Sequence, residues 1–302
     1  LQVSDELMKR YLTGFGRNFT NEYRTNGTFT TPLGMGEFFA LAMPFVIQFI
    51  LGEYRTRARI LAGLSVVFLF IPILFTGSRT GMIGYFMAIM LYLPIWGLQR
   101  WRRGNPLGPA VVLGYPVIGA VFLAATFVIG HLRRIVWGGG ETVSSNQGRY
   151  DQYHLAVPKV LHRPWGYGIG RGGITLNYHD PGGLLTIDVY YLKVIMEFGV
   201  LGLLIYIGIL ASGAAYSARD GLRAENIADQ EIGFLNSTMV ALLAYMVMKI
   251  GFAGEDNQSI VFMMLGAVAA LVWRARRNRS LEPSVETVRR ALPITVVGDD
   301  LV

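Results

Sequence analysis

The chain has 302 residues, of which 52% are hydrophobic and only 16% are charged. This is too little charge to cover a soluble globule of this size, so the composition argues against a soluble protein and for a polytopic membrane protein. The net charge of +7 is almost wholly arginine, because there are only four lysines, and the lack of cysteine excludes disulfides, iron–sulfur clusters and thiolate catalysis. Arginine suits bidentate phosphate binding, although many arginines of membrane proteins only anchor cytoplasmic loops.

Residues 1–31 mix charged and aromatic side chains without a spanning run, so we expect a periplasmic or interfacial segment. No signal peptide is visible in them, and we expect further chain ahead of them. Seven apolar runs follow, each near the roughly 17 to 25 residues that a membrane-spanning helix needs. They cover residues 33–51, 58–76, 81–98, 110–130, 187–211, 232–252 and 259–273. Lipid requires each span to satisfy its own backbone polar groups, which predicts an all-α polytopic membrane protein of about seven transmembrane helices.

A polar, glycine-rich stretch of about 55 residues, 131–186, separates the fourth and fifth runs and is too long for a simple turn. It holds all four histidines of the chain, His131, His154, His162 and His179. We expect this large loop and the spans to form one domain, residues 32–279. Residues 280–302 lack a long apolar period and are expected to be a flexible cytoplasmic tail.

Arginine-rich connections predict the orientation of the spans. If the seven spans alternate, most short arginine-rich connections fall on one side, which is expected to be the cytoplasm. These arginines are Arg55, Arg57, Arg59, Arg100, Arg102, Arg103, Arg219, Arg223, Arg274, Arg276, Arg277 and Arg279. The large loop is then periplasmic and the C-terminus cytoplasmic. Arg133 and Arg134, just beyond a span on the outer side, count against this assignment.

Charged residues near the outer ends of the spans are candidates for a site. Arg79 lies in the turn between two spans, where it must find an anionic partner or only anchor the helix at the head groups. Asp188 lies at the outer end of its span, level with Arg79, and is either a functional carboxylate or an acidic residue favoured by the helix dipole. Lys193 and Glu197, four residues apart, are expected to pair with each other, whereas Glu37 has no evident partner.

The large loop is expected to begin with a short helix running up to Pro164, which would place Asp151 and His154 on one face. Such a pair is more often structural than catalytic. The loop histidines lack the close spacing of zinc ligands, so no metal site is expected. A GxGxxG string, Gly168 to Gly173, lies outside any βαβ unit, and we interpret it as a flexible turn whose N–H groups could still approach an anion.

Four stretches of sequence share an order and an expected placement at one membrane face. They are TNGTFTTPLGMGEFFALAMPF, TGSRTGMIGYFMAI, GRYDQYHLAVPKVLHRPWGYGIG and DVYYLKVIMEFGVLGLL, and the similarity covers roughly residues 26–210. Together they resemble the bacterial O-antigen ligase and polysaccharide polymerase superfamily. Members of that superfamily are inner-membrane glycosyltransferases with a large periplasmic loop. They move a glycan from undecaprenyl pyrophosphate to an acceptor sugar, either on lipid A core or on another lipid-linked repeat.

This resemblance implies roles for individual residues. Arg79 and Arg149 match the arginines that would bind the pyrophosphate. Our hypothesis adds Arg171 as a weaker third arginine, Asp188 as the acceptor of the proton from the acceptor hydroxyl, and His179 as the alternative base. Membrane lipids, the lipid-linked donor and a glycan or lipid A core acceptor are the implied partners. No cofactor, metal or nucleic acid is implied.

One departure from the ligases favours a polymerase. Ligases typically carry a histidine shortly before the GxxG pattern that is Gly199 to Gly202 here, where this chain has Asp188, and the nearest histidine, His179, comes too early. A lipid A core ligase stays an alternative. A transporter or flippase for an anionic or lipid-linked solute is an alternative of another class, because buried charges also mark transport paths. A non-catalytic scaffold is a third alternative.

Overall fold

The protein is described here by a computed structural model, which covers residues 24–25, 27–128, 130, 142–179, 183, 185–223 and 229–291. These residues form helices and no extended strand, apart from an isolated bridge between His179 and Leu185. The helices are α2 (Pro32–Leu51), α3 (Thr56–Thr76), α4 (Arg79–Arg102), α5 (Leu107–Val128), α7 (Thr142–His162), α8 (Gly172–Leu176), α9 (Tyr190–Arg223), α10 (Gln230–Met248) and α11 (Gln258–Ala291). The predicted all-α polytopic membrane fold is confirmed.

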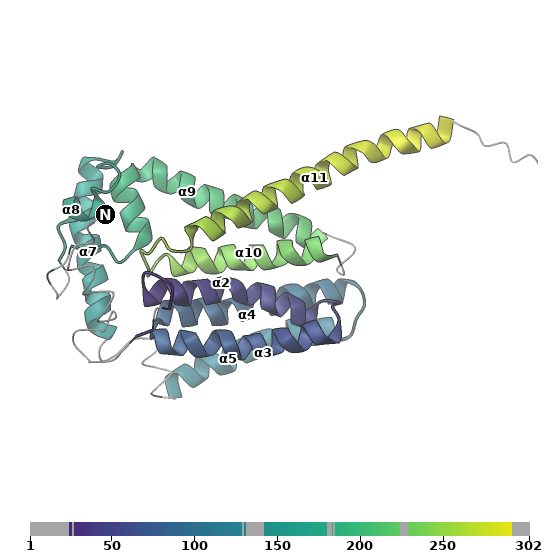
Figure 1. Cartoon of the computed structure of the whole chain (residues 1–302), viewed down its shortest axis with the longest axis horizontal. Helices are drawn as coiled ribbons and strands as arrows, with labels where there is room; N and C mark the ends of the chain where they lie inside the picture. The colour runs from purple at the N-terminus through teal and green to yellow at the C-terminus, as the bar shows by residue number, and fades with distance from the viewer. Residues whose placement is uncertain are drawn as a thin grey trace, which may run out of the picture.

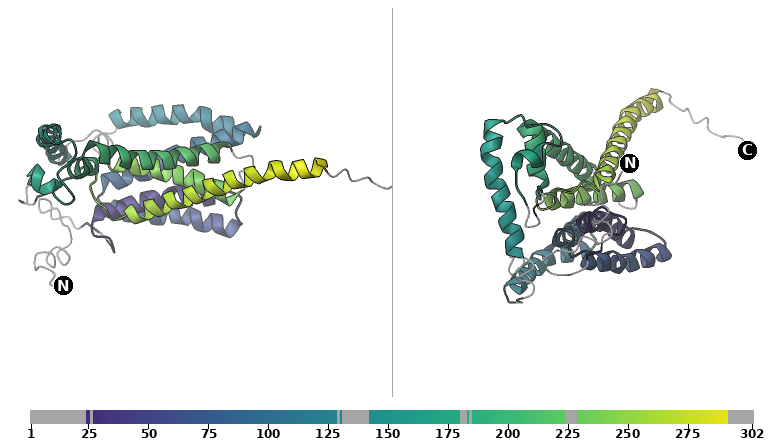
Figure 2. Two further views of the ribbon diagram at one scale, coloured as in Figure 1. Left: turned by 90° about the horizontal axis from the view of Figure 1, so that it is seen from above. Right: turned by 60° about the vertical axis from the view of Figure 1, so that its left-hand side comes forward.

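The long helices run side by side, and α7 lies across one end of their bundle (Figures 1 and 2). We call this the loop end, because α7 and α8 both come from the predicted large loop. The α3–α4 turn and the segment between α10 and α11 lie there as well. The α2–α3 and α4–α5 connections lie at the opposite end, beyond which α11 projects (Figure 1). The bundle therefore has a loop end, across which α7 lies, and an opposite end formed by the α2–α3 and α4–α5 connections.

Six of the described helices, α2, α3, α4, α5, α9 and α10, are long and apolar enough to cross a membrane. The seventh expected span, 259–273, falls in a shorter apolar stretch, Gln258–Arg274, of α11. That helix continues to Ala291, so residues 280–291 of the expected flexible tail are helical, and residues 292–302 lie outside the described part. Helix α9 likewise runs to Arg223, well beyond the expected end at 211.

The core of the bundle lies between α2, α4 and α10. Small residues allow these backbones to approach closely: a Cβ added to Gly81 would lie 2.9 Å from the Cα of Gly36. Ala88 and Ala241 are fully buried in the same core. In contrast, α3 and α5 turn large apolar side chains outward, and Phe68 is 73% exposed. Large apolar surfaces on neighbouring helices are unfavourable in water. The outer faces of α3 and α5 are therefore suited to contact with lipid or with further helices.

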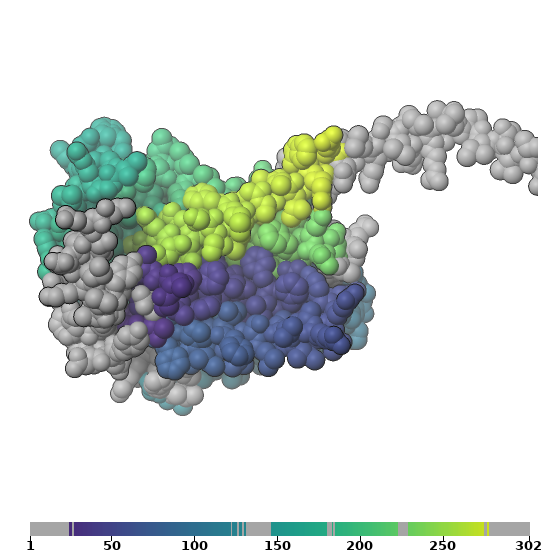
Figure 3. All heavy atoms as spheres, in the orientation of Figure 1, coloured from purple at the N-terminus to yellow at the C-terminus, as the bar shows by residue number. Residues whose placement is uncertain are grey.

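The described part of the loop packs as a cap on the end of the bundle (Figure 3). A second apolar core joins α7, α8 and the start of α9, and it consists of Ala156, Leu176, Val189, Leu192 and Met196. Lys159 of α7 donates from Nζ to the carbonyls of Thr175 and Leu176, at 2.7 Å each, and so caps the C-terminus of α8. These contacts hold α7 in a fixed place across the loop end.

Helix α9 is kinked at Gly199, whose φ of 75° and ψ of −174° only glycine adopts readily. The glycine-rich turn of the loop packs into this kink. Tyr167 and Gly168 donate their N–H groups to the carbonyls of Met196 and Glu197, and Val200 donates to the carbonyl of Pro164 at 2.8 Å. The kink thus leaves backbone polar groups of α9 without helical partners, and the loop satisfies them, in part through the N–H group of Gly168 from the GxGxxG string.

We expect Gly199→Ala to destabilise the protein by about 2 kcal/mol or more, because a Cβ there is strained at this φ and would lie 2.6 Å from the Cα of Trp165. The measurement is thermal unfolding in detergent. Gly208→Ala is the matched control on α9, because a Cβ at Gly208 meets nothing within 4 Å and alanine favours the helix. Equal unfolding temperatures for the two variants would contradict the kink's importance.

Candidate functional site

A cavity of about 640 Å³ lies at the loop end. Arg79, Arg149 and Asp188, which the sequence singled out separately, line it together. They come from the start of α4, from α7 and from the segment just before α9. The other lining residues are Arg24, Thr31, Leu33, Gly77, Thr80, Ile83, Asn146, Thr186, Ile187, Val247, Met248, Ile250, Gly251, Phe252, Ala253 and Gly254. The cavity therefore unites segments that are distant in sequence.

The α3–α4 turn sets the position of Arg79. Gly77 ends α3 in the left-handed conformation, with φ 58°, and Ser78 caps α4 by accepting from the N–H of Gly81 at 3.0 Å. The N–H of Ser78 in turn donates to Thr76 Oγ1 at 3.1 Å. Arg79 is consequently the first residue of α4, at the helix end whose dipole is positive. A guanidinium and a helix N-terminus together favour an anion at this wall of the cavity.

Arg149 lies half-buried on α7 and makes contacts with neutral groups. Its Nη2 donates to the Gly251 carbonyl at 3.1 Å, and its Nη1 donates to Asn146 Oδ1 at 3.3 Å. Its Nε is buried and has no acceptor among the described residues. The described residues also form no ion pair with it. A buried donor and an uncompensated charge beside a cavity are what an anionic ligand would satisfy.

Asp188 is fixed by Gln152, a fully buried side chain of α7. Gln152 donates from Nε2 to Asp188 Oδ2 at 3.0 Å and accepts from the Asp188 N–H at 2.9 Å. Thr186 Oγ1 donates to the other carboxylate oxygen at 3.2 Å. Asp188 lies two residues before α9 begins at Tyr190. This reciprocal clamp holds the carboxylate at the cavity in one orientation.

Arg171 and His179 do not join this cavity. Both side chains are exposed: Arg171 precedes α8, and His179 lies in the isolated bridge with Leu185. His154 and His162, on α7, are exposed as well. His131 lies outside the described residues. Among the described residues, the arrangement therefore groups the arginines and the aspartate, without a histidine.

Several residues at the site were not predicted from the sequence: Arg24 and residues 250–254 line the cavity, and Gln152 holds Asp188 from behind it. Arg24 donates from Nε to the Thr76 carbonyl at 2.6 Å, but residues 1–31 show no helical period that would have singled it out. Gln152 lies three residues after Arg149 on α7, and this spacing was the available signal for a second inward side chain. Nothing in the apolar pattern pointed to the wall formed by residues 250–254.

One expected charge contact differs in the structure, and a carboxylate without an expected partner has one. Lys193 pairs with Glu255 at 2.6 Å and not with Glu197, because the chain after α10 brings an acidic side chain closer. Glu37, for which the sequence suggested no partner, has a buried one in Lys249 at 2.8 Å. Both partners come from the segment around the end of α10, which short-range spacing does not relate to α2 or α9.

The Asp151 and His154 side chains have other partners than each other. Asp151 accepts from Gln147 at 2.9 Å, while the ring of His154 lies 4.2 Å from that of Tyr150. On α7 the short-range neighbour Gln147 is the better donor to the carboxylate. This removes a reason to place histidine chemistry on α7.

Comparison with known proteins shows a similarity to one family over part of the chain. Residues 64–207 match the family model described as O-antigen ligase. This stretch of the chain is similar to the O-antigen ligase family. This confirms the resemblance to the O-antigen ligase and polymerase superfamily, and the matched stretch contains Arg79, Arg149 and Asp188 but ends before residues 250–254. No curated protein and no solved structure matches the chain.

Proposed function

We propose that this protein, which is similar to O-antigen ligases over residues 64–207, is an inner-membrane glycosyltransferase of cell-surface polysaccharide synthesis. It transfers a glycan from undecaprenyl pyrophosphate to an acceptor sugar, without a metal. The observation that carries the proposal is that Arg79, Arg149 and Asp188 line one cavity. Among the described residues, Arg149 donates hydrogen bonds only to the neutral groups of Asn146 and Gly251.

In the proposed reaction the acceptor hydroxyl oxygen attacks the anomeric carbon of the donor glycan. A carbon–oxygen bond forms while the bond from that carbon to the pyrophosphate oxygen breaks. The electron pair leaves with undecaprenyl pyrophosphate, where Arg79, Arg149 and the α4 N-terminus stabilise the growing negative charge. Asp188, held by Gln152, takes the proton of the attacking hydroxyl. Arg171 and His179 have no part, because they lie away from the cavity.

The two ends of the bundle support an orientation. The last turn of α4 carries Arg100 and Arg102, and α9 ends at Arg223, all at the end opposite the cavity. Arginines concentrate on the cytoplasmic side of membrane proteins. We therefore assign the loop end and its cavity to the periplasm and the C-terminus to the cytoplasm.

Polymerase is the favoured form of the activity, and ligase is the second candidate. An aspartate, and not a histidine, lies at the cavity before α9, which favours polymerisation of lipid-linked repeats. The description of the matching family favours transfer to lipid A core. A transporter has less support. The cavity lies at the loop end, beside the packed cap of α7 and α8, which suits chemistry at one face of the membrane better than passage through it.

Reconstitution in vesicles tests the proposal. With the undecaprenyl-pyrophosphate-linked repeat alone, we expect a ladder of longer lipid-linked glycans together with free undecaprenyl pyrophosphate, unchanged by a chelator such as EDTA. Product only after addition of lipid A core would identify a ligase instead. Movement of the donor between leaflets without any new glycosidic bond would overturn the proposal in favour of a flippase. Loss of the ladder in EDTA would contradict metal independence.

A further inference from the structure

The bundle contains a buried ion pair that the proposed reaction does not use. Lys249, directly after α10, is fully buried, and Glu37 of α2 is 1% exposed. Their Nζ and Oε1 atoms are 2.8 Å apart. Burying two charges costs more in desolvation than a typical ion pair returns, so such a pair is weak evidence for stability. A role in fixing one conformation is the better account of it.

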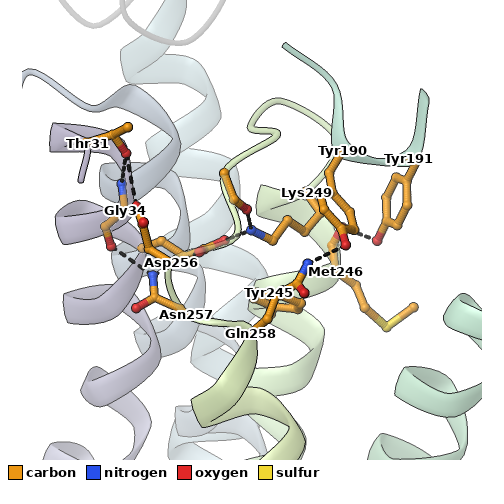
Figure 4. A network of polar contacts seen from close by, with 12 residues as sticks. Thr31, Gly34, Tyr190, Tyr191, Tyr245, Met246, Lys249, Asp256, Asn257 and Gln258 are labelled. Atoms are coloured by element: carbon orange, nitrogen blue, oxygen red, sulfur yellow. Dashed lines mark hydrogen bonds and ion pairs between the residues drawn. The ribbon is translucent and has the colours of Figure 1, made fainter. Parts of the chain in front are cut away.

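Further contacts complete the surroundings of both charged groups. Lys249 Nζ donates to the Gly254 carbonyl at 2.5 Å. The same ammonium lies 5.2, 4.7 and 4.9 Å from the ring centroids of Tyr190, Tyr245 and Phe252. Figure 4 shows the Lys249 side chain beside Tyr190 and Tyr245, with its nitrogen pointing toward the side on which Asp256 lies. The ammonium is thus held from α2, α9 and α10 and by the segment that follows α10.

The Glu37 carboxylate also holds the far end of the segment between α10 and α11, residues 249–257. Asn257 donates from Nδ2 to Glu37 Oε2 at 2.9 Å and to the Gly34 carbonyl at 2.8 Å. Thr31 Oγ1 donates to Oδ2 of Asp256, the residue before Asn257, at 3.2 Å (Figure 4). The ion pair therefore fixes residues 249 and 257, the two ends of the α10–α11 segment, to the start of α2.

This segment is a wall of the cavity. Residues 250–254 line it, and the Gly251 carbonyl accepts the hydrogen bond from Arg149. The Lys249 carbonyl accepts from the N–H of Tyr190 at 3.3 Å, two residues after Asp188. One short segment thus contacts the α7 arginine and the backbone beside the aspartate.

We propose that Glu37 and Lys249 are positioning residues, which lock the 249–257 segment so that Arg149 and Asp188 face the same cavity. Neither side chain lines the cavity itself. The kinetic consequence rests on the proposed glycosyl transfer, whereas the structural consequence does not. Both residues lie outside the stretch matched by the family model, residues 64–207.

The test uses Lys249→Met, Glu37→Gln and the double variant Glu37→Gln/Lys249→Met in the full chain. The native chain has no cysteine, so Ala253→Cys in the cavity wall reports on the segment through its rate of modification by a water-soluble thiol reagent. We expect the thiol introduced by Ala253→Cys to react several times faster in each variant than in the otherwise native chain. For folded protein, kcat is expected to fall about tenfold to a hundredfold, as for other displaced catalytic groups.

Controls separate positioning from folding. Lys193→Met removes a lysine of α9 that forms a solvent-exposed ion pair with Glu255 of the same segment. It should change neither the labelling rate of the Ala253→Cys thiol nor kcat. Ile169→Cys, on an exposed site of the loop, reports general reagent access and should label at one rate in all backgrounds. If Lys249→Met prevents folding, Glu37→Gln and the double variant carry the test, since neither leaves a buried carboxylate and a missing lysine together.

Unchanged labelling of the Ala253→Cys thiol and unchanged kcat in folded Glu37→Gln and double variants would overturn the inference. A double variant that restores both labelling and kcat to the parent values would also overturn it, because the pair would then act only through its charge balance. Wild-type transfer by Arg149→Ala would instead defeat the proposed function, and the labelling result would still decide whether the pair fixes the segment.

Discussion

Arg149→Ala is expected to lower kcat for glycan transfer about 10²- to 10³-fold, the usual cost of removing one preorganised donor from a developing negative charge. Arg149 is suited to this role because its buried Nε has no acceptor among the described residues and its other contacts are to the neutral groups of Gly251 and Asn146. The pyrophosphate would supply the missing acceptor. The measurement is the initial rate of chain extension from the lipid-linked repeat in vesicles.

Graded variants sharpen this prediction. Arg149→Lys keeps the charge but loses the planar fork, and it should fall between the alanine variant and the wild type. Arg79→Ala should show a loss of the same order, because its guanidinium lies on the same cavity. Arg163→Ala is the matched control, an exposed loop arginine stacked on Tyr167 at 5.5 Å and away from the cavity. Rates for Arg149→Ala within about twofold of this control would refute anion binding by Arg149.

Asp188→Asn is expected to reduce kcat about 10²- to 10⁴-fold, the range for loss of a general base. Asparagine has nearly the same shape, so the Thr186 and Gln152 side chains can still enclose it. Donor affinity should change little, because the carboxylate is assigned to the acceptor hydroxyl and not to the pyrophosphate. The measurement is kcat and the donor KM for the same chain-extension reaction.

Asp151→Asn provides the control for Asp188→Asn. Asp151 is a loop carboxylate with its own partner, Gln147, and it does not line the cavity. Its variant should transfer glycan at the wild-type rate. A large rise in donor KM with little change in kcat for Asp188→Asn would assign the carboxylate to donor binding, and near-normal kcat and KM would exclude it as the base.

Short-range sequence patterns predicted the bundle and one face of the site. Runs of apolar residues located the six helices that are long enough to span, because lipid admits only segments that satisfy their own hydrogen bonds. Because consecutive spans cross the membrane in alternating directions, the sequence also predicted that Arg79 and Asp188 lie at the same face of the membrane. The structure brings both residues to one cavity. Their roles stay predictions until transfer is measured.

The limits of apolar runs are clear in α11 and α9. Hydropathy ended the last span near residue 273, but α11 is helical to Ala291, because a charged stretch can continue a helix that already exists. The same pattern could not detect the kink at Gly199, which depends on Pro164 and Trp165 of the loop lying against α9. Local composition does not report such contacts.

Partners of polar side chains were decided by tertiary structure. Lys193 and Glu197 are four residues apart, yet Lys193 reaches Glu255, which lies 62 residues along the chain. Gln152 and Asp188 are separated by 36 residues, and Arg149 and Gly251 by 102. Helical periodicity relates a residue to neighbours three or four positions away, so none of these contacts could be derived from it.

The sequence by itself determined that the chain is a helical membrane protein with a large polar loop, and that arginine and carboxylate chemistry lies near the ends of its spans. Those properties follow from composition and from runs within one segment. Only the tertiary structure decided that Arg171 and His179 lie away from the cavity, and that residues 250–254 form its wall. The physical reason is that a cavity is made where segments pack, and packing depends on contacts between residues far apart in the chain.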